Sequence, residues 1–224
     1  MRTLAAWLVH LYTASSAVFG LWAVYAISVQ QYRLAMFLML VTLFIDSTDG
    51  MLARAADVRG LIPWFDGRRL DDICDYFTYV LVPAWFLIAA ELLPHPAWAA
   101  VPVLASAYGF SREDAKTEDH FFLGFPSYWN VVAIYMYLLQ LSPLTALLIT
   151  LVLAAGVFVP IRYLYPSRTP VLRPLTLVVL CLWGLAFVWL AVHPDPDPRW
   201  VQLSLFGPLY YVGLSLLLNW RRAR

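Results

Sequence analysis

Four aspartates at helical spacing are the side chains best placed to do chemistry in this sequence. Asp46 and Asp49 interrupt an otherwise apolar segment over about residues 34–54, and their i, i+3 spacing puts them on one helical face. Asp71 and Asp75 follow at i, i+4 where the next apolar stretch begins. Carboxylates in or near lipid are costly and normally face a polar cavity or a partner, so all four are candidate functional residues.

The four carboxylates together indicate a divalent metal centre. Unscreened negative charges at close range repel, and a hard cation with oxygen ligands relieves that repulsion. We therefore predict Mg²⁺ or Mn²⁺ as cofactor, held by Asp46, Asp49, Asp71 and Asp75. Such ions suit diphosphate substrates because they neutralise charge that develops on the leaving group.

Small residues and a cation accompany the first aspartate pair. Gly50 and Ala53 keep one helical face narrow, which lets a ligand approach the backbone or lets two helices pack closely. Arg54 adds a forked cation suited to phosphate.

The composition requires a membrane-embedded helical protein. Hydrophobic residues make up 62% of 224 positions, charged residues only 13%, and the mean hydropathy is +0.71. Apolar stretches long enough to cross a bilayer as helices recur along the chain. There are eight, covering about residues 5–28, 34–54, 70–92, 97–111, 126–141, 144–161, 174–192 and 201–219. No internal repeat or linker divides them, so we expect an all-α polytopic membrane bundle forming one catalytic domain over residues 1–224.

The basic residues predict the orientation of the bundle. With the N-terminus inside, 13 of the 15 Lys and Arg residues fall on the cytoplasmic side, and only Arg33 and Arg199 fall outside. This asymmetry follows the positive-inside rule and predicts that both termini and the aspartates lie at the cytoplasmic face. The net charge of +1 gives no indication of nucleic-acid binding.

A longer motif contains the four aspartates. The pattern is Asp46-x-x-Asp49-Gly50-x-x-Ala53-Arg54, followed by Gly67-x-x-x-Asp71-x-x-x-Asp75. It resembles the signature of the CDP-alcohol phosphotransferase family. Twelve residues, 55–66, separate Arg54 from Gly67, which is longer than in most of that family. That spacing and the run Lys116–Asn130 are similar to the bacterial phosphatidylcholine synthase branch.

The resemblance implies a role for each motif position. It implies a six-helix core with two further helices beside it, in a bacterial inner membrane, and the family's members are often homodimers. Asp46, Asp49 and Asp71 resemble the metal ligands that hold the CDP diphosphate, and Asp75 resembles the base that deprotonates the acceptor alcohol. The positions expected to bind CDP-diacylglycerol are Asp46, Asp49, Gly50, Ala53, Arg54 and Gly67.

Choline is the acceptor that the branch implies. A quaternary ammonium has no N–H donor and is usually recognised by aromatic faces, often with a carboxylate nearby. The candidate choline contacts are Tyr76, Tyr79, Glu118, Asp119 and Trp129. Aromatic residues are abundant in this chain, so packing or an interfacial position is an alternative role for each. Arg112 and Lys116 either contact phosphate or serve the inside-positive charge bias.

Two rival functions leave parts of this interpretation unchanged. The same enzyme class with serine, inositol or glycerol phosphate as acceptor would keep the aspartate core, although an anionic acceptor would need more cations near Asp75. A lipid or cation transporter would need acids along a crossing path, whereas these acids gather at one membrane face.

Overall fold

The structure, a computed structural model, describes residues 1–222 and is built almost entirely from helices. The last two residues, including Arg224 at the terminus predicted to be cytoplasmic, lie outside the described residues. Five helical segments of the described chain are long and apolar enough to span a membrane. They are α1 (Arg2–Ser28), α2 (Tyr32–Ala55), a segment over Gly67–Ala89, α9 (Arg173–Val192), and a segment over Pro198–Arg221 that contains α10 (Pro198–Ser204) and most of α11 (Phe206–Arg222).

Three shorter helices complete the predicted set. They are α6 (Ala100–Ser111), preceded by the 3₁₀ turn η2 (Pro96–Ala99), α7 (Trp129–Leu138) and α8 (Pro143–Phe158). At 12, 10 and 16 residues these helices are shorter than the roughly 20 residues that a straight crossing needs. Each of the eight predicted stretches thus contains a helix, and the prediction of an all-α polytopic membrane protein is confirmed.

The third long segment is not one regular α-helix. It consists of α4 (Gly67–Asp75), a π-helical turn η1 (Tyr76–Leu81) and α5 (Val82–Ala89). The π-helical turn begins directly after Asp75, one of the four candidate aspartates. A π-turn adds a residue to the helical turn and re-aims the side chains that follow, and such turns are often found at functional sites.

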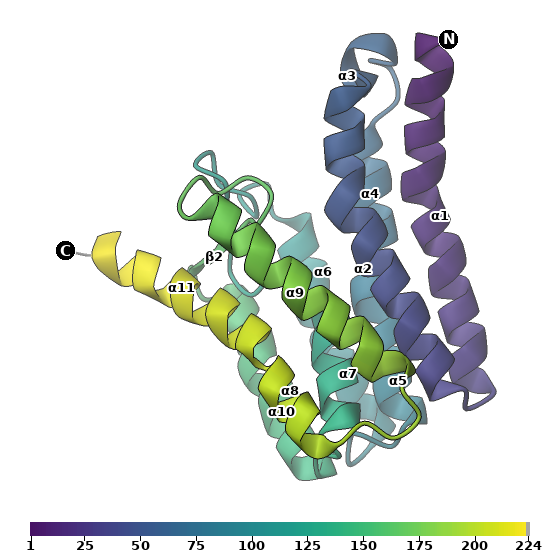
Figure 1. Cartoon of the computed structure of the whole chain (residues 1–224), viewed down its shortest axis with the longest axis vertical. Coiled ribbons are helices and arrows are strands. Elements are labelled where there is room, and N and C mark those ends of the chain that lie inside the picture. Colours follow the sequence, from purple (N-terminus) through teal and green to yellow (C-terminus); the bar gives the residue numbers. More distant parts are fainter. Residues whose placement is uncertain (223–224) are drawn as a thin grey trace.

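The long N-terminal helices form one side of the molecule. In Figure 1, α1 and α2 run side by side in opposite directions, with α4 beside them. Fully buried alanines, Ala23 and Ala26 on α1 and Ala35 on α2, lie in the main core. Small side chains allow helix backbones to approach closely, which is the usual source of packing energy within a membrane.

The same core extends to the later helices. Phe86 of α5, Ile134 of α7 and Phe187 of α9 are all completely buried in the cluster that holds the alanines. In Figure 1, α9 and α11 cross the picture obliquely, and the α11 end carries the C-terminus away from the α1–α2 pair.

The twelve-residue connection between Arg54 and Gly67 packs against the N-terminal part of α1. It contains the short helix α3 (Val58–Leu61), and both Val58 and Ile62 are buried against Ala6. Asp57 begins α3 in the left-handed region at φ +47°, and a side chain at Gly60 would collide with its carboxylate. The connection is therefore an ordered element that joins α2 to α4.

Two three-residue strands are the sheet structure of residues 1–222. Strand β1 (Phe121–Leu123) pairs antiparallel with β2 (Arg162–Leu164), with Phe122 opposite Tyr163. The hydroxyl of Thr169 also donates a hydrogen bond to the carbonyl of His120 at 2.6 Å. The strands therefore fix the loop between α6 and α7 to the segment that leads into α9.

Candidate active site

Three of the four motif aspartates meet where α2 and α4 lie together. Carboxylate oxygens of Asp46, Asp49 and Asp71 all lie within 4.8 Å of one another. Asp49 is buried, and Asp46 and Asp71 are half-buried. The helical spacing predicted from the sequence thus brings carboxylates from two helices to one point.

Hydrogen bonds from two other elements orient this trio. Tyr79, on the π-helical turn, donates its hydroxyl to Oδ2 of Asp46 at 2.6 Å. Thr13, on α1, donates its hydroxyl to Oδ2 of Asp49 at 2.8 Å. Sequence reasoning missed Thr13, although the polar pairs Tyr12–Thr13 and Ser15–Ser16 within an apolar helix were a usable signal.

The donor set fits a hard divalent cation. Oδ1 of Asp71 is buried without a hydrogen-bond partner, and it stands among the other carboxylates of the trio. A buried unpaired carboxylate oxygen is costly, and an ion with oxygen ligands would satisfy it. These residues therefore fit Mg²⁺ or Mn²⁺, as the sequence predicted.

Asp75 lies close to the trio without belonging to it. It is one helical turn beyond Asp71 and lies within electrostatic range of Asp46 and Asp71. The three carboxylates that converge within 4.8 Å do not include it. Its predicted roles, as a metal ligand and as the base that takes the acceptor proton, both stay predictions.

The positions expected to contact the nucleotide surround α2 and α4. The Arg54 guanidinium folds back over Gly50, where a side chain would stand 3.3 Å from its Nη1. Ala53 packs against the cluster that includes Val58. Gly67 opens α4, and a side chain there would stand 2.6 Å from the ring of His10. Nucleotide contact at these positions stays a prediction.

Lys116 is the cation that the tertiary structure brings to the aspartates. Its ammonium lies 3.9 Å from the carboxylate of Asp72, the neighbour of Asp71. Burial by itself lowers the pKa of Lys116, but nearby negative charges, Asp71 foremost, outweigh it and raise the pKa above its ordinary value. An isolated bridge pairs Lys116 with Phe122, which fixes its backbone to the strand pair. Lys116 is therefore a protonated cation at the site.

The five predicted choline contacts lie in different surroundings. Tyr79 bonds Asp46 as described, whereas Tyr76 donates its hydroxyl to the carbonyl of Val103 at 3.1 Å. Glu118 is exposed, and Asp119 is paired with Arg162 at 2.9 Å.

Trp129 has a packing role in the second core cluster. It is completely buried, and its indole N–H donates to Ser106 at 2.8 Å. Its ring therefore has no accessible face in this structure, and choline contact by this residue stays a prediction.

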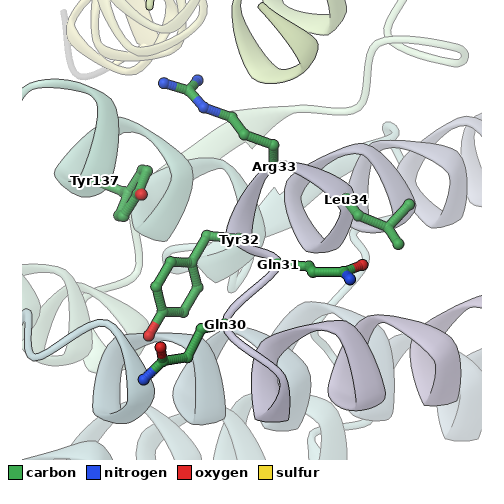
Figure 2. A pocket seen from close by; sticks show the side chains of 6 residues that line it. All are labelled: Gln30, Gln31, Tyr32, Arg33, Leu34 and Tyr137. Carbon is green, nitrogen blue, oxygen red and sulfur yellow. The ribbon is translucent and has the colours of Figure 1, made fainter. Parts of the chain in front are cut away.

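A cavity of about 360 Å³ lies elsewhere, at the α1–α2 turn. Figure 2 shows its six lining residues, Gln30, Gln31, Tyr32, Arg33, Leu34 and Tyr137. Arg33 and Asp46 are 13 positions apart along α2, which corresponds to roughly 20 Å of helix. The cavity is therefore separate from the aspartates. The candidate active site is identified by its converging carboxylates and not by this cavity.

Comparisons with known proteins agree with the motif. The sequence profile described as CDP-alcohol phosphatidyltransferase matches residues 2–162. A protein named phosphatidylcholine synthase from Legionella pneumophila is 40% identical, over 97% of this chain and 88% of its own length. Proteins of that name from Borreliella burgdorferi and Pseudomonas aeruginosa are 38% and 37% identical, covering 84% and 98% of this chain and 82% and 92% of their own lengths. A profile match over this much of the sequence, centred on aspartates that the fold brings together, shows that the chain belongs to the CDP-alcohol phosphatidyltransferase family.

Proposed function

We propose that this protein is a phosphatidylcholine synthase, which transfers the phosphatidyl group of CDP-diacylglycerol to choline and releases CMP. The observation that carries the proposal is the convergence of Asp46, Asp49 and Asp71, with Asp75 one turn away, on two helices of the matched family region. The relatives named phosphatidylcholine synthase, which match nearly the whole chain, support choline as the acceptor.

The proposed reaction is a substitution at one phosphorus atom. The choline hydroxyl oxygen forms a bond to the phosphorus that carries diacylglycerol. The bond from that phosphorus to the bridging oxygen breaks, and CMP leaves with the electron pair. The hydroxyl proton passes to Asp75. Positioning and charge neutralisation supply most of the catalysis in phosphoryl transfer of this kind.

The chain's own residues divide the work. Asp75 holds the acceptor hydroxyl and takes its proton, since an alcohol is a weak nucleophile at neutral pH. Tyr79 and Thr13 hold Asp46 and Asp49 in place through their hydroxyl groups. Mg²⁺ or Mn²⁺ bound by Asp46, Asp49 and Asp71 would neutralise charge on the diphosphate.

Lys116 and Arg54 would contact the same substrate from two sides. Lys116 reaches the site from the loop between α6 and α7, and Arg54 from the end of α2. Both cations suit phosphate oxygens, Arg54 as a fork and Lys116 as a point charge.

An anionic acceptor is the second candidate within the same class. Lys116 lies within electrostatic range of Asp75, so a cation is available there for an acceptor such as glycerol phosphate. The names of the relatives favour choline over this alternative.

The proposed setting is a bacterial inner membrane, with both termini and the aspartates at the cytoplasmic face. The apolar helices and bacterial relatives support a membrane position, and the uneven distribution of basic residues supports this orientation. We treat the chain as one catalytic domain, and a homodimer stays a prediction to be tested by the mass of the purified protein in detergent.

The direct test is a reconstituted assay. Purified protein in detergent is incubated with CDP-diacylglycerol, Mg²⁺ or Mn²⁺ and a panel of labelled alcohols comprising choline, serine, inositol and glycerol phosphate. We expect phosphatidylcholine and CMP in equal amounts with choline alone. Asp75→Asn should lower turnover about a thousandfold, within the range ascribed to general base catalysis. Product from a different alcohol would overturn choline as acceptor, and no CMP with any alcohol would overturn the enzyme assignment.

A further inference from the structure

A row of four tyrosines, Tyr79, Tyr128, Tyr211 and Tyr163, leads away from the aspartates. Ring centroids are 5.8 Å apart between Tyr79 and Tyr128 and again between Tyr128 and Tyr211. Tyr163 stacks on Tyr211 at 6.1 Å. We call this set the tyrosine row, and its members come from η1, the loop before α7, α11 and β2.

The row begins at the reacting groups. Tyr79 is hydrogen-bonded to Asp46, and the hydroxyl of Tyr128 lies within electrostatic range of both Asp46 and Asp75. The hydroxyl groups of Tyr128 and Tyr211 also interact with each other. Aromatic faces and carboxylates thus occur together beside Asp75.

Half of the row lies outside the region that the family profile covers. The profile ends at residue 162, whereas Tyr163 and Tyr211 follow it in the chain. The Tyr211 hydroxyl donates a hydrogen bond to the carbonyl of Leu164 at 2.9 Å. This bond fixes the Tyr211 ring, and with it α11, to strand β2. The C-terminal helix therefore contributes an ordered aromatic side chain next to a site that is otherwise built by the matched region.

We propose that Tyr128 and Tyr211 bind the quaternary ammonium group of the acceptor alcohol, while the buried Tyr79 holds Asp46 behind them. This proposal rests on the proposed function and names the residues that would recognise the acceptor alcohol. Tyr128 and Tyr211 are half-buried, so each residue keeps some exposed surface. The 69° angle between the rings of Tyr128 and Tyr211 would let a cation lie over one face while it meets the edge of the other.

The length of choline agrees with this placement. Two carbon atoms separate its nitrogen from its hydroxyl, so the ammonium must bind next to the group that takes the hydroxyl proton. Tyr128 lies next to Tyr79, which is hydrogen-bonded to Asp46, and it is within electrostatic range of Asp75. The negative charges of Asp46 and Asp75 would add attraction for a cation and would disfavour an anionic acceptor.

Steady-state kinetics of Tyr211→Leu, Tyr211→Phe and Tyr128→Phe test the proposal. In Tyr211→Leu we expect the KM for choline to rise about tenfold, as for the loss of a partly desolvated cation–π contact. The KM for CDP-diacylglycerol should stay within twofold. Both phenylalanine variants keep the ring and should retain a KM for choline within about threefold of the wild-type value.

Tyr210→Leu is the matched control. Tyr210 precedes Tyr211 on α11 and is hydrogen-bonded to Thr176 of α9 instead of joining the row. Its replacement removes a tyrosine from the same helix, so its KM for choline should not change. Thermal unfolding of each variant in detergent shows that the fold is retained.

Tetramethylammonium supplies a second, binding-only readout. It carries the quaternary group without a hydroxyl, so it should compete with choline and its inhibition constant should rise in Tyr211→Leu in parallel with the KM for choline. An unchanged KM for choline in Tyr211→Leu, or an equal rise in both KM values, would overturn the tyrosine row as the acceptor site. Wild-type protein that makes no phosphatidylcholine would instead overturn the proposed function, so the two failures are distinct.

Discussion

The two ends of α2 both carry charged side chains in an apolar helix, but these side chains differ in whether the protein supplies their partners. At the N-terminal end, the Arg33 guanidinium donates to the carbonyls of Leu190 and Pro194 at 3.0 and 3.1 Å and lies over the ring of Tyr137. At the other end, Asp46 and Asp49 meet Asp71, whose Oδ1 has no hydrogen-bond partner. The charge at the N-terminal end is hydrogen-bonded within the protein, whereas the aspartate group at the other end keeps a carboxylate oxygen without a partner.

This difference is the one expected between a structural charge and a candidate functional one. A buried polar group without a partner costs free energy, so a fold retains one where something else binds. Arg33 lines a cavity of about 360 Å³, but its guanidinium already has carbonyl partners, whereas the aspartates need a ligand. The unsatisfied end is therefore the better candidate active site.

Removing a carboxylate from the unsatisfied end should give the largest effect. We expect Asp71→Asn to lower turnover at least about a thousandfold, because loss of metal charge stabilisation amounts to several kcal/mol. Treating the wild type with a chelator should have the same effect, and Mg²⁺ or Mn²⁺ should restore turnover in the wild type alone.

Asp66→Asn is the matched control for this substitution. Asp66 caps α4 by accepting from the backbone N–H of Arg69, and an asparagine can do the same. Its turnover should stay within twofold of the wild-type value. Full activity in Asp71→Asn would remove Asp71 from the site.

Removing the cation at the same end should have an intermediate effect. Lys116→Met is expected to lower kcat/KM for CDP-diacylglycerol about 10- to 100-fold, the range for a lost charge-assisted hydrogen bond. The raised pKa of Lys116 means that its favourable charge interactions are complete below its ordinary value of 10.5 and are lost only as the pH rises through the higher folded value. The loss should therefore be independent of pH around neutrality.

Arg112→Met is the control for Lys116. Arg112 lies on the same loop, but its guanidinium is already bonded to Asp114 at 2.7 and 2.8 Å. Its replacement should leave kcat/KM nearly unchanged. Equal losses in the two variants would mean that the general charge of the loop matters and that the position of Lys116 does not.

Removing the charge at the satisfied end should have the smallest effect on catalysis and a visible effect on stability. Arg33→Met removes the two hydrogen bonds to carbonyls near the end of α9. We expect kcat/KM to stay within twofold and the thermal unfolding midpoint to fall by about 5 °C. The unfolding midpoint of Arg33→Lys should lie between those of the wild type and Arg33→Met, since lysine keeps the charge without the forked guanidinium. A large loss of activity in Arg33→Met would break the distinction between the two ends.

Sequence patterns predicted the parts of the site that depend on local helical geometry. The i, i+3 and i, i+4 spacings place Asp46 with Asp49 and Asp71 with Asp75 on helical faces in any helix. Sustained hydrophobicity located the helices of all eight segments for a similar reason, because lipid leaves the backbone few other ways to satisfy its hydrogen bonds.

Contacts between distant segments could not be predicted in this way. The π-helical turn that aims Tyr79 at Asp46 depends on packing around α4 and α5. Lys116 reaches Asp72 only because short strands hold its loop. A strand of three residues is too short to give a recognisable hydrophobic pattern in the sequence. The sequence therefore did not show that the loop of Lys116 is held against the aspartates.

By itself the sequence determined the membrane helices and the pairing of the aspartates on helical faces, since each follows from composition or from spacing within one segment. The family followed from the resemblance of the longer motif to a known signature. Only the tertiary structure decided which side chains surround those aspartates. It buried Trp129 against Ser106 and brought Tyr211 beside Tyr128 from a helix some 80 positions later in the chain. Such contacts depend on how helices pack against one another, and small differences in packing select among many aromatic side chains that the sequence leaves equivalent.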